Sequence, residues 1–183
     1  HKYLLDGVAI PSVTSVLPYN YTGDNQEAMT RGLYVHKAIE MYEAGTLDED
    51  NLDPALAPYL ESYKMAERLG YDNLIIDYKT GFKHPCTALQ LVGYYELVRC
   101  NKTIPMECRE IQLYHPTYRF AGTIDFVRLT NENDYKMKVF ALYLQADGSQ
   151  GKYEDHSKDL SLNTQIFLSF VTTYKWRKEN KLL

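Results

Sequence analysis

The segment from Leu74 to Gly81 constrains this chain most, because it is an apolar run that ends in a charged pair. It reads Leu-Ile-Ile-Asp-Tyr-Lys-Thr-Gly, which predicts a buried strand followed by a turn. Side chains on a strand alternate between its two faces, so Asp77 and Lys79 share one face while Tyr78 points to the other. Two charges at the end of a buried strand are costly unless they are paired or bound to something. A carboxylate that holds a divalent metal ion, beside a lysine that meets negative charge, would offset that cost.

The composition is that of an ordinary globular protein, and 183 residues predict a single domain over residues 1–183. No apolar run approaches the ~20 residues needed to cross a bilayer, so we expect no membrane partner. The three cysteines, Cys86, Cys100 and Cys108, are scattered, which favours reduced thiols in a cytoplasmic protein and excludes a four-cysteine iron–sulfur cluster. A net charge of −4 is not typical of a nucleic-acid binder, but a metal-dependent site must itself be acidic.

Hydrophobic periodicity and turn residues predict an α/β fold, with a central mixed sheet flanked by helices. We expect a short hairpin around Asp6-Gly7 and a turn at Asn131–Asp134. The expected helices run from Gln26 to Ala44, from Pro54 to Gly70, from Ala88 to Val98 and from Leu162 to Arg177. The expected strands run from Leu74 to Lys79, from Glu110 to Tyr114, from Arg119 to Leu129 and from Lys138 to Leu144.

Four motifs together resemble the PD-(D/E)XK nuclease superfamily, and within it the RecB-like and phage-type exonucleases. Asp77-Tyr78-Lys79 is similar to the family's Asp-x-Lys strand, and Gly122-Thr123-Ile124-Asp125 to its Gly-x-x-Asp strand. Gln90 and Tyr94 resemble its Gln-x-x-x-Tyr helix, and the segment from Gly32 to Glu40 resembles its helix with a metal-binding histidine. The start of the chain, Tyr3 through Leu17, is similar to the N-terminus of the phage-type members.

One feature departs from the family: its Gly-x-x-Asp strand precedes its Asp-x-Lys strand, whereas Asp125 here follows Asp77. A permuted gene, segments joined in a non-native order and a partly fortuitous match each explain this order. A sheet keeps its geometry under permutation when the cut falls in surface loops. We therefore expect a restriction-endonuclease-like core of permuted motif order, with Asp77, Lys79 and Asp125 on one sheet.

The resemblance implies a role for each matched residue. Asp77, Asp125 and His36 would hold Mg²⁺ or Mn²⁺, with the carbonyl of Tyr78 as a further ligand, and the histidine suits Mn²⁺ better. Lys79 would polarise the attacking water. Gln90 and Tyr94 would position the DNA or the water. Glu40 would orient the His36 imidazole as an outer partner, and Glu110 is a weaker candidate for the metal shell.

The implied function is a metal-dependent DNA exonuclease of phage or prophage origin, used in recombination or repair. Its expected partners are DNA, a single-strand annealing recombination protein and further copies of the chain. Two alternatives remain: a non-catalytic nucleic-acid-binding relative of the same fold, and a restriction-type endonuclease. A structural ion pair between Asp77 and Lys79 is the simplest non-catalytic interpretation of the opening motif.

Overall fold

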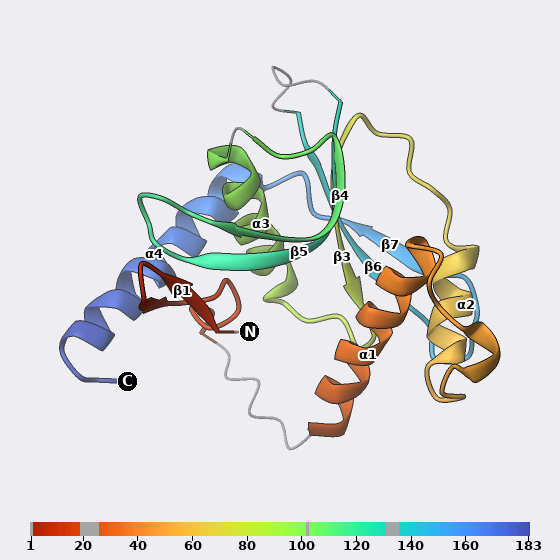
Figure 1. Cartoon of the computed structure of the whole chain (residues 1–183). Coiled ribbons are helices and arrows are strands. Elements are labelled where there is room, and N and C mark those ends of the chain that lie inside the picture. Colours follow the sequence, from red (N-terminus) through yellow and green to blue (C-terminus); the bar gives the residue numbers. More distant parts are fainter. Residues whose placement is uncertain (1, 19–25, 102, 131–135) are drawn as a thin grey trace.

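The computed structural model describes residues 2–18, 26–101, 103–130 and 136–183, and it folds into one α/β domain (Figure 1). The predicted turn at Asn131–Asp134 lies outside the described residues. The strands are β1 (Tyr3–Leu5), β2 (Val8–Ile10), β3 (Asn73–Lys79), β4 (Glu107–Tyr114), β5 (Ala121–Leu129), β6 (Lys138–Tyr143) and β7 (Lys152–Asp155). The helices are α1 (Gln26–Glu43), the 3₁₀ turn η1 (Glu49–Asn51), α2 (Ala57–Met65), α3 (Thr87–Cys100) and α4 (Leu160–Glu179).

Five strands form one mixed sheet in the order β4-β5-β3-β6-β7, and β1 and β2 form a separate hairpin. Strand β3 lies at the centre, parallel to β6 and antiparallel to β5. The strand of Asp125 is therefore the direct neighbour of the strand of Asp77, although a helix and another strand separate them in the chain. Their places in the sheet agree with the expectation that one sheet carries both residues.

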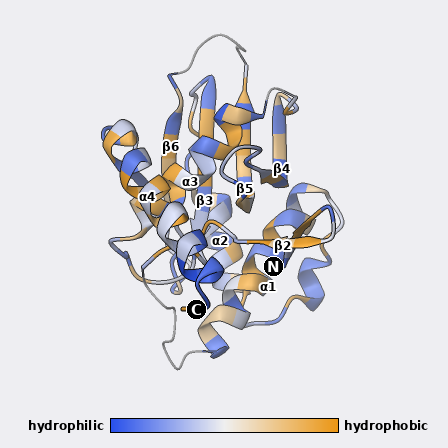
Figure 2. Ribbon diagram, turned by 90° about the vertical axis from the view of Figure 1, so that its left-hand side faces the viewer, coloured by the Kyte–Doolittle hydropathy of each residue, from blue (hydrophilic) through white to orange (hydrophobic). Residues whose placement is uncertain are grey.

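Helices cover both faces of the sheet, with α3 and α4 on one side and α1 and α2 on the other (Figure 1). Strand β3 supplies both layers by alternation, because Ile75 packs on the α3 side while Leu74 and Ile76 pack on the α2 side. Figure 2 shows long hydrophobic stretches on the central strands, as expected for a sheet buried on both faces. Within the described part of the chain, no helix is long and apolar enough to span a membrane.

Most element boundaries agree with the sequence to within three residues. The turn at Asp6-Gly7 has positive φ at both residues, 52° and 76°, as a tight two-residue hairpin requires. The prediction that Pro54 opens the second helix is wrong, and so is its end at Gly70. Helix α2 begins at Ala57 with Pro58 in its first turn, because the side chain of Asp53 bonds the Ala55 N–H and holds a turn there.

Strand β7 was not predicted. Its four residues are mostly charged or polar, so they carry no apolar alternation that would distinguish an edge strand from a loop. It is defined by antiparallel pairing with β6, in which Phe140 lies opposite Asp155 and Tyr143 opposite Lys152. Only tertiary pairing therefore reveals this strand.

Helix α3 approaches its neighbours closely at Gly93. A Cβ at this position would lie 2.7 Å from Val13 Cγ1 and 2.8 Å from Phe167 Cζ, inside the distances that real side chains keep. Since the Val13 N–H also donates to the Ala121 carbonyl at 2.8 Å, this contact ties α3, α4 and β5 together. The absence of a side chain at Gly93 thus sets the depth at which α3 sits on the sheet.

We predict that Gly93→Val destabilises the fold by about 1–3 kcal/mol, because valine overpacks this contact and brings no gain in helix propensity comparable to that of alanine. Urea unfolding followed by circular dichroism measures the change. Gly70→Val is the matched control, since a Cβ there meets nothing within 4 Å. Equal stability of Gly93→Val and the parent protein would contradict the tight packing of α3.

Candidate functional site

Asp125 lies where β3 and β5 stop pairing. The antiparallel register between these strands runs from Asn73 opposite Leu129 to Ile76 opposite Phe126 and does not continue. Beyond it, the Asp125 carboxylate replaces the backbone of β5 as the partner of β3, since its Oδ2 accepts the Tyr78 N–H at 2.5 Å. Because the side chain of Asp125 is almost fully buried, this bond holds a negative charge at a fixed point between the two strands.

The regular alternation of side chains along β4 and β5 breaks at the same place. Phe126 packs in the cluster on the α2 side, yet Ile124, two residues away, packs in the cluster on the α3 side. Residues two apart on a regular strand share a face, so the alternation shifts at the residue opposite Glu110. Glu110 itself has a φ of 49°, the left-handed region that non-glycine residues seldom adopt, and the register omits it. This irregularity directs the carboxylates of both strands to one spot.

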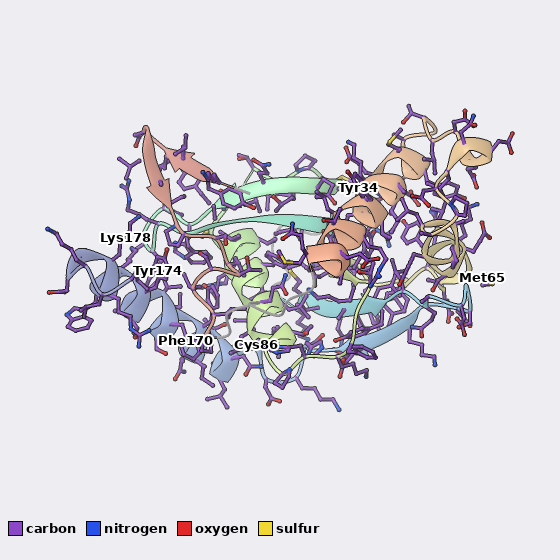
Figure 3. The ribbon with its side chains drawn as sticks, turned by 90° about the horizontal axis from the view of Figure 1, so that it is seen from below. Tyr34, Met65, Cys86, Phe170, Tyr174 and Lys178 are labelled. Atoms are coloured by element: carbon purple, nitrogen blue, oxygen red, sulfur yellow. The ribbon has the colours of Figure 1, made fainter. Side chains whose placement is uncertain are left out.

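His36 reaches the same spot from α1. Its Nδ1 lies 3.1 Å from Asp125 Oδ1, and its ring packs edge-on to that of Tyr78 with centroids 6.0 Å apart. Figure 3, seen from below, shows α1 crossing the ends of the strands, with Tyr34 labelled on it. Ligand atoms of His36, Glu110 and Asp125 all lie within 4.8 Å of one another, which is a spacing that one metal ion could bridge.

A second chain of contacts joins β3 to α3. Lys79 Nζ lies 2.6 Å from Asp77 Oδ2 and donates to Gln90 Oε1 at 2.7 Å. Gln90 Nε2 in turn donates to the Tyr94 hydroxyl at 2.9 Å. The alternation predicted for Asp77, Tyr78 and Lys79 holds, since the two charged residues meet on one face and Tyr78 packs in the opposite cluster. Gln90 and Tyr94 therefore fix the ammonium group of Lys79 from the adjacent helix.

Both sets of residues line one open groove of about 1060 Å³. Its floor carries His36, Glu110 and Asp125 together with Asp77 and Lys79, and helix α1 and the loop after β3 form its walls. A smaller cavity of about 90 Å³ lies between α1, α2 and the sheet, where Tyr78 is the one residue with a role implied by the motifs. The groove is the site that brings the chemically relevant side chains together.

Burial and crowded charge perturb the acids and the histidine. Burial raises the pKa of Asp77 above its usual range, against the opposing charge of Lys79. Burial, and after it the charge of Asp125, raises the pKa of Glu110 to about 7. For His36, burial works in the opposite direction, but the charge and hydrogen bond of Asp125 raise the pKa to about 9. Each shift has the direction expected where negative charge is in excess.

The charges that line the groove are close to balanced. Four carboxylates, those of Glu40, Asp77, Glu110 and Asp125, stand against the permanent cations Arg31, Lys37 and Lys79 and against His36, whose raised pKa favours its charged form. A divalent cation among the carboxylates would give the groove an excess of positive charge. Carboxylate oxygens and an imidazole are also donors that Mg²⁺ and Mn²⁺ accept in proteins, so the residues present fit the implied metal.

The structure places two of the predicted acidic residues differently from the expectation. Glu110 belongs to the three-residue cluster with His36 and Asp125, although the sequence ranked it as the weaker candidate. Asp77, expected as a principal ligand, instead pairs with Lys79 and lies outside that cluster. Nothing in the sequence signals the positive φ of Glu110, so only its position opposite Asp125 on the predicted hairpin could have promoted it.

Glu40 does not act as expected. Its Oε2 accepts from Lys37 Nζ at 2.7 Å, and the described hydrogen bond that orients the His36 ring comes from Asp125. The Lys37–Glu40 pair lines the groove with both side chains partly exposed, so this ion pair costs little to break. The Tyr78 carbonyl remains a predicted ligand, and the structure assigns the N–H of that residue to Asp125.

Comparisons of the chain with protein-family models, with curated proteins and with solved structures found no match. The geometry of the groove therefore carries the functional argument.

We predict that Mn²⁺ binds this cluster and that Glu110→Gln weakens binding by at least about tenfold, since loss even of an outer partner has that effect. Isothermal titration calorimetry on the purified protein gives both affinities. The matched control is Glu40→Gln, which removes a groove carboxylate that pairs with Lys37 instead. If the two variants lose affinity equally, the metal does not select the cluster of His36, Glu110 and Asp125.

Proposed function

We propose that the protein is a metal-dependent DNA exonuclease that hydrolyses phosphodiester bonds, built on a permuted restriction-endonuclease-like core. The observation that carries this proposal is the convergence of two units in one groove. One unit is the donor cluster of His36, Glu110 and Asp125, and the other is the Lys79 ammonium group held by Asp77 and Gln90.

The sheet supports the proposed core. Strand β3 lies between an antiparallel neighbour that carries Asp125 and a parallel neighbour, β6, and α3 follows β3 directly with Gln90 and Tyr94. The motifs that resemble the nuclease family thus meet in space in spite of their order in the chain. Permutation of the hairpin β4–β5 accounts for this order, because its two strands pair with each other over most of their length.

A bound divalent metal would supply charge neutralisation on the phosphate and an activated water. The side chains of this chain supply the rest. Lys79, held beside Asp77, presents its ammonium group to the negative charge that develops on the phosphate. Gln90 restrains the lysine in this position, and the Tyr94 hydroxyl restrains Gln90. Arg31, whose Nε is buried without a hydrogen-bond partner among the described residues, adds positive charge to the wall of the groove.

An exonuclease is favoured over a restriction-type endonuclease because the motifs resemble, within the superfamily, the RecB-like and phage-type exonucleases. The intact set of Asp77, Lys79 and Asp125 argues against a purely binding relative. The annealing protein and the homo-oligomer stay predictions from the family resemblance.

We predict that Lys79→Ala lowers cleavage of linear double-stranded DNA in Mg²⁺ or Mn²⁺ by at least about 10²- to 10³-fold, the usual cost of one charge-stabilising donor. EDTA abolishes the parent activity, and covalently closed circles are spared. A fluorescence assay of DNA loss reports all three results. Cutting of circles into discrete bands would indicate the endonuclease instead, and binding without any turnover would indicate the non-catalytic relative.

The controls separate catalysis from folding. Lys152→Ala removes an exposed lysine of β7 outside the groove and leaves the rate unchanged. Loss of Lys79 leaves the buried Asp77 without its ion pair, so the alanine variant is less stable than the parent. The double variant Asp77→Asn/Lys79→Met removes both charges, regains stability and remains inactive. Full activity of either folded variant would refute the role of Lys79.

A further inference from the structure

The loop after β3 presents an aromatic side chain at the groove. Phe82 is 101% exposed, more than any other large hydrophobic residue that the structure describes. Single exposed apolar residues are common and by themselves need no explanation. Phe82, however, lines the same groove as Lys79 and follows it by three residues, so their backbones lie within about 11 Å of each other. The ring therefore stands beside the place where a phosphate would be bound.

The chain after Phe82 is attached to the body of the protein. Lys83 Nζ lies 3.3 Å from Glu154 Oε2 on β7 and 5.5 Å from the ring centroid of Tyr143 on β6. His84 Nδ1 accepts the Cys86 N–H at 3.1 Å, and the His84 carbonyl accepts the Thr87 N–H at the start of α3. These contacts limit the positions open to Phe82, so its exposure is imposed by a restrained loop.

Apolar side chains of α1 also line the groove. Met29 and Leu33 lie one turn apart on α1, both more than half exposed, and both line the groove. The groove thus combines an ionic floor with an apolar mouth. A phosphodiester offers the floor a charged phosphate, and an attached base offers the mouth an apolar face. Inside a duplex those faces are covered by stacking, and at a blunt end the base is held by its pairing partner, so an unpaired base is the one free to turn its face to the mouth while its phosphate meets the floor.

We propose that Phe82 stacks on an unpaired nucleobase next to the bound phosphate and thereby makes the groove select nucleic-acid ends with unpaired bases. This inference rests on the proposed function only in that a phosphodiester occupies the floor. Phe82 sets specificity and takes no part in bond breaking. Aromatic stacking tolerates every base, so the selection is for unpaired structure and not for sequence.

Binding to two DNA probes tests the proposal. We would measure fluorescence anisotropy with a labelled short single strand and a labelled blunt hairpin, in Ca²⁺, with a gel to verify intact DNA. Phe82→Ala weakens single-strand binding about tenfold, the usual effect of losing one stacked base, and leaves hairpin binding nearly unchanged. Phe82→Trp retains single-strand affinity, which shows that an aromatic face is what matters.

Trp176→Ala is the matched control, because Trp176 is an exposed aromatic residue that does not line the groove. It belongs to the last turns of α4, and α4 lies on the far side of the molecule from α1 (Figure 1). Figure 3 labels Tyr174 and Lys178 on this helix, away from α1. This variant binds both probes as the parent does. An unchanged single-strand affinity of Phe82→Ala, or an equal loss on both probes, overturns the proposal.

The experiments distinguish failure of the stacking role from failure of the proposed nuclease activity. Parent protein that cleaves linear DNA while Phe82→Ala binds single strands normally would retain the nuclease and remove the stacking role. Parent protein that cleaves nothing but loses single-strand affinity with Phe82→Ala would retain the stacking role and remove the nuclease.

Discussion

The buried carboxylate of Asp125 is the interaction on which the arrangement of the site depends. It accepts the Tyr78 N–H from β3 and lies 3.1 Å from His36 on α1, so it connects the two strands and the helix that covers them. An uncompensated charge at that depth would be expensive, and these partners reduce its cost. The same contacts leave a groove open above the carboxylate, because β3 and β5 no longer pair there. Structural stability and access for a ligand therefore originate in one irregular point of the sheet.

That irregularity has a backbone cost, which Glu110 shows most directly. A left-handed φ at a glutamate is unfavourable and persists where surrounding structure determines it. Here the flanking ladder between β4 and β5 does so, with Arg109 opposite Phe126 on one side and Ile111 opposite Ile124 on the other. In this backbone conformation, the Glu110 carboxylate joins Asp125 and His36. The backbone strain thus lies at the cluster of metal-type donors.

The groove has two chemically different regions, a charged floor and an apolar mouth. Its floor holds a cluster of carboxylates, to which a divalent ion would add positive charge. Its mouth holds Phe82, Met29 and Leu33, which offer no charge to a ligand. A ligand with a phosphate and a flat base complements both regions. The proposed nuclease activity and the proposed preference for unpaired ends follow from these two regions separately, so each stands on its own observation.

Local periodicity and spacing in the sequence predict the α/β class, most helices and the face shared by Asp77 and Lys79. The expectation that His36, Gln90 and Asp125 lie near this pair rests instead on the resemblance of the motifs to a nuclease family. The sequence-based prediction missed β7, misplaced the start of α2, and underrated Glu110. Those features depend on pairing between distant segments: β7 exists through β6, and Glu110 turns because β5 lies opposite. The sequence led us to expect Asp77 and Asp125 on one sheet, but the direct adjacency of their strands is known only from the tertiary structure, since strand order in a sheet is set by packing and not by order in the chain.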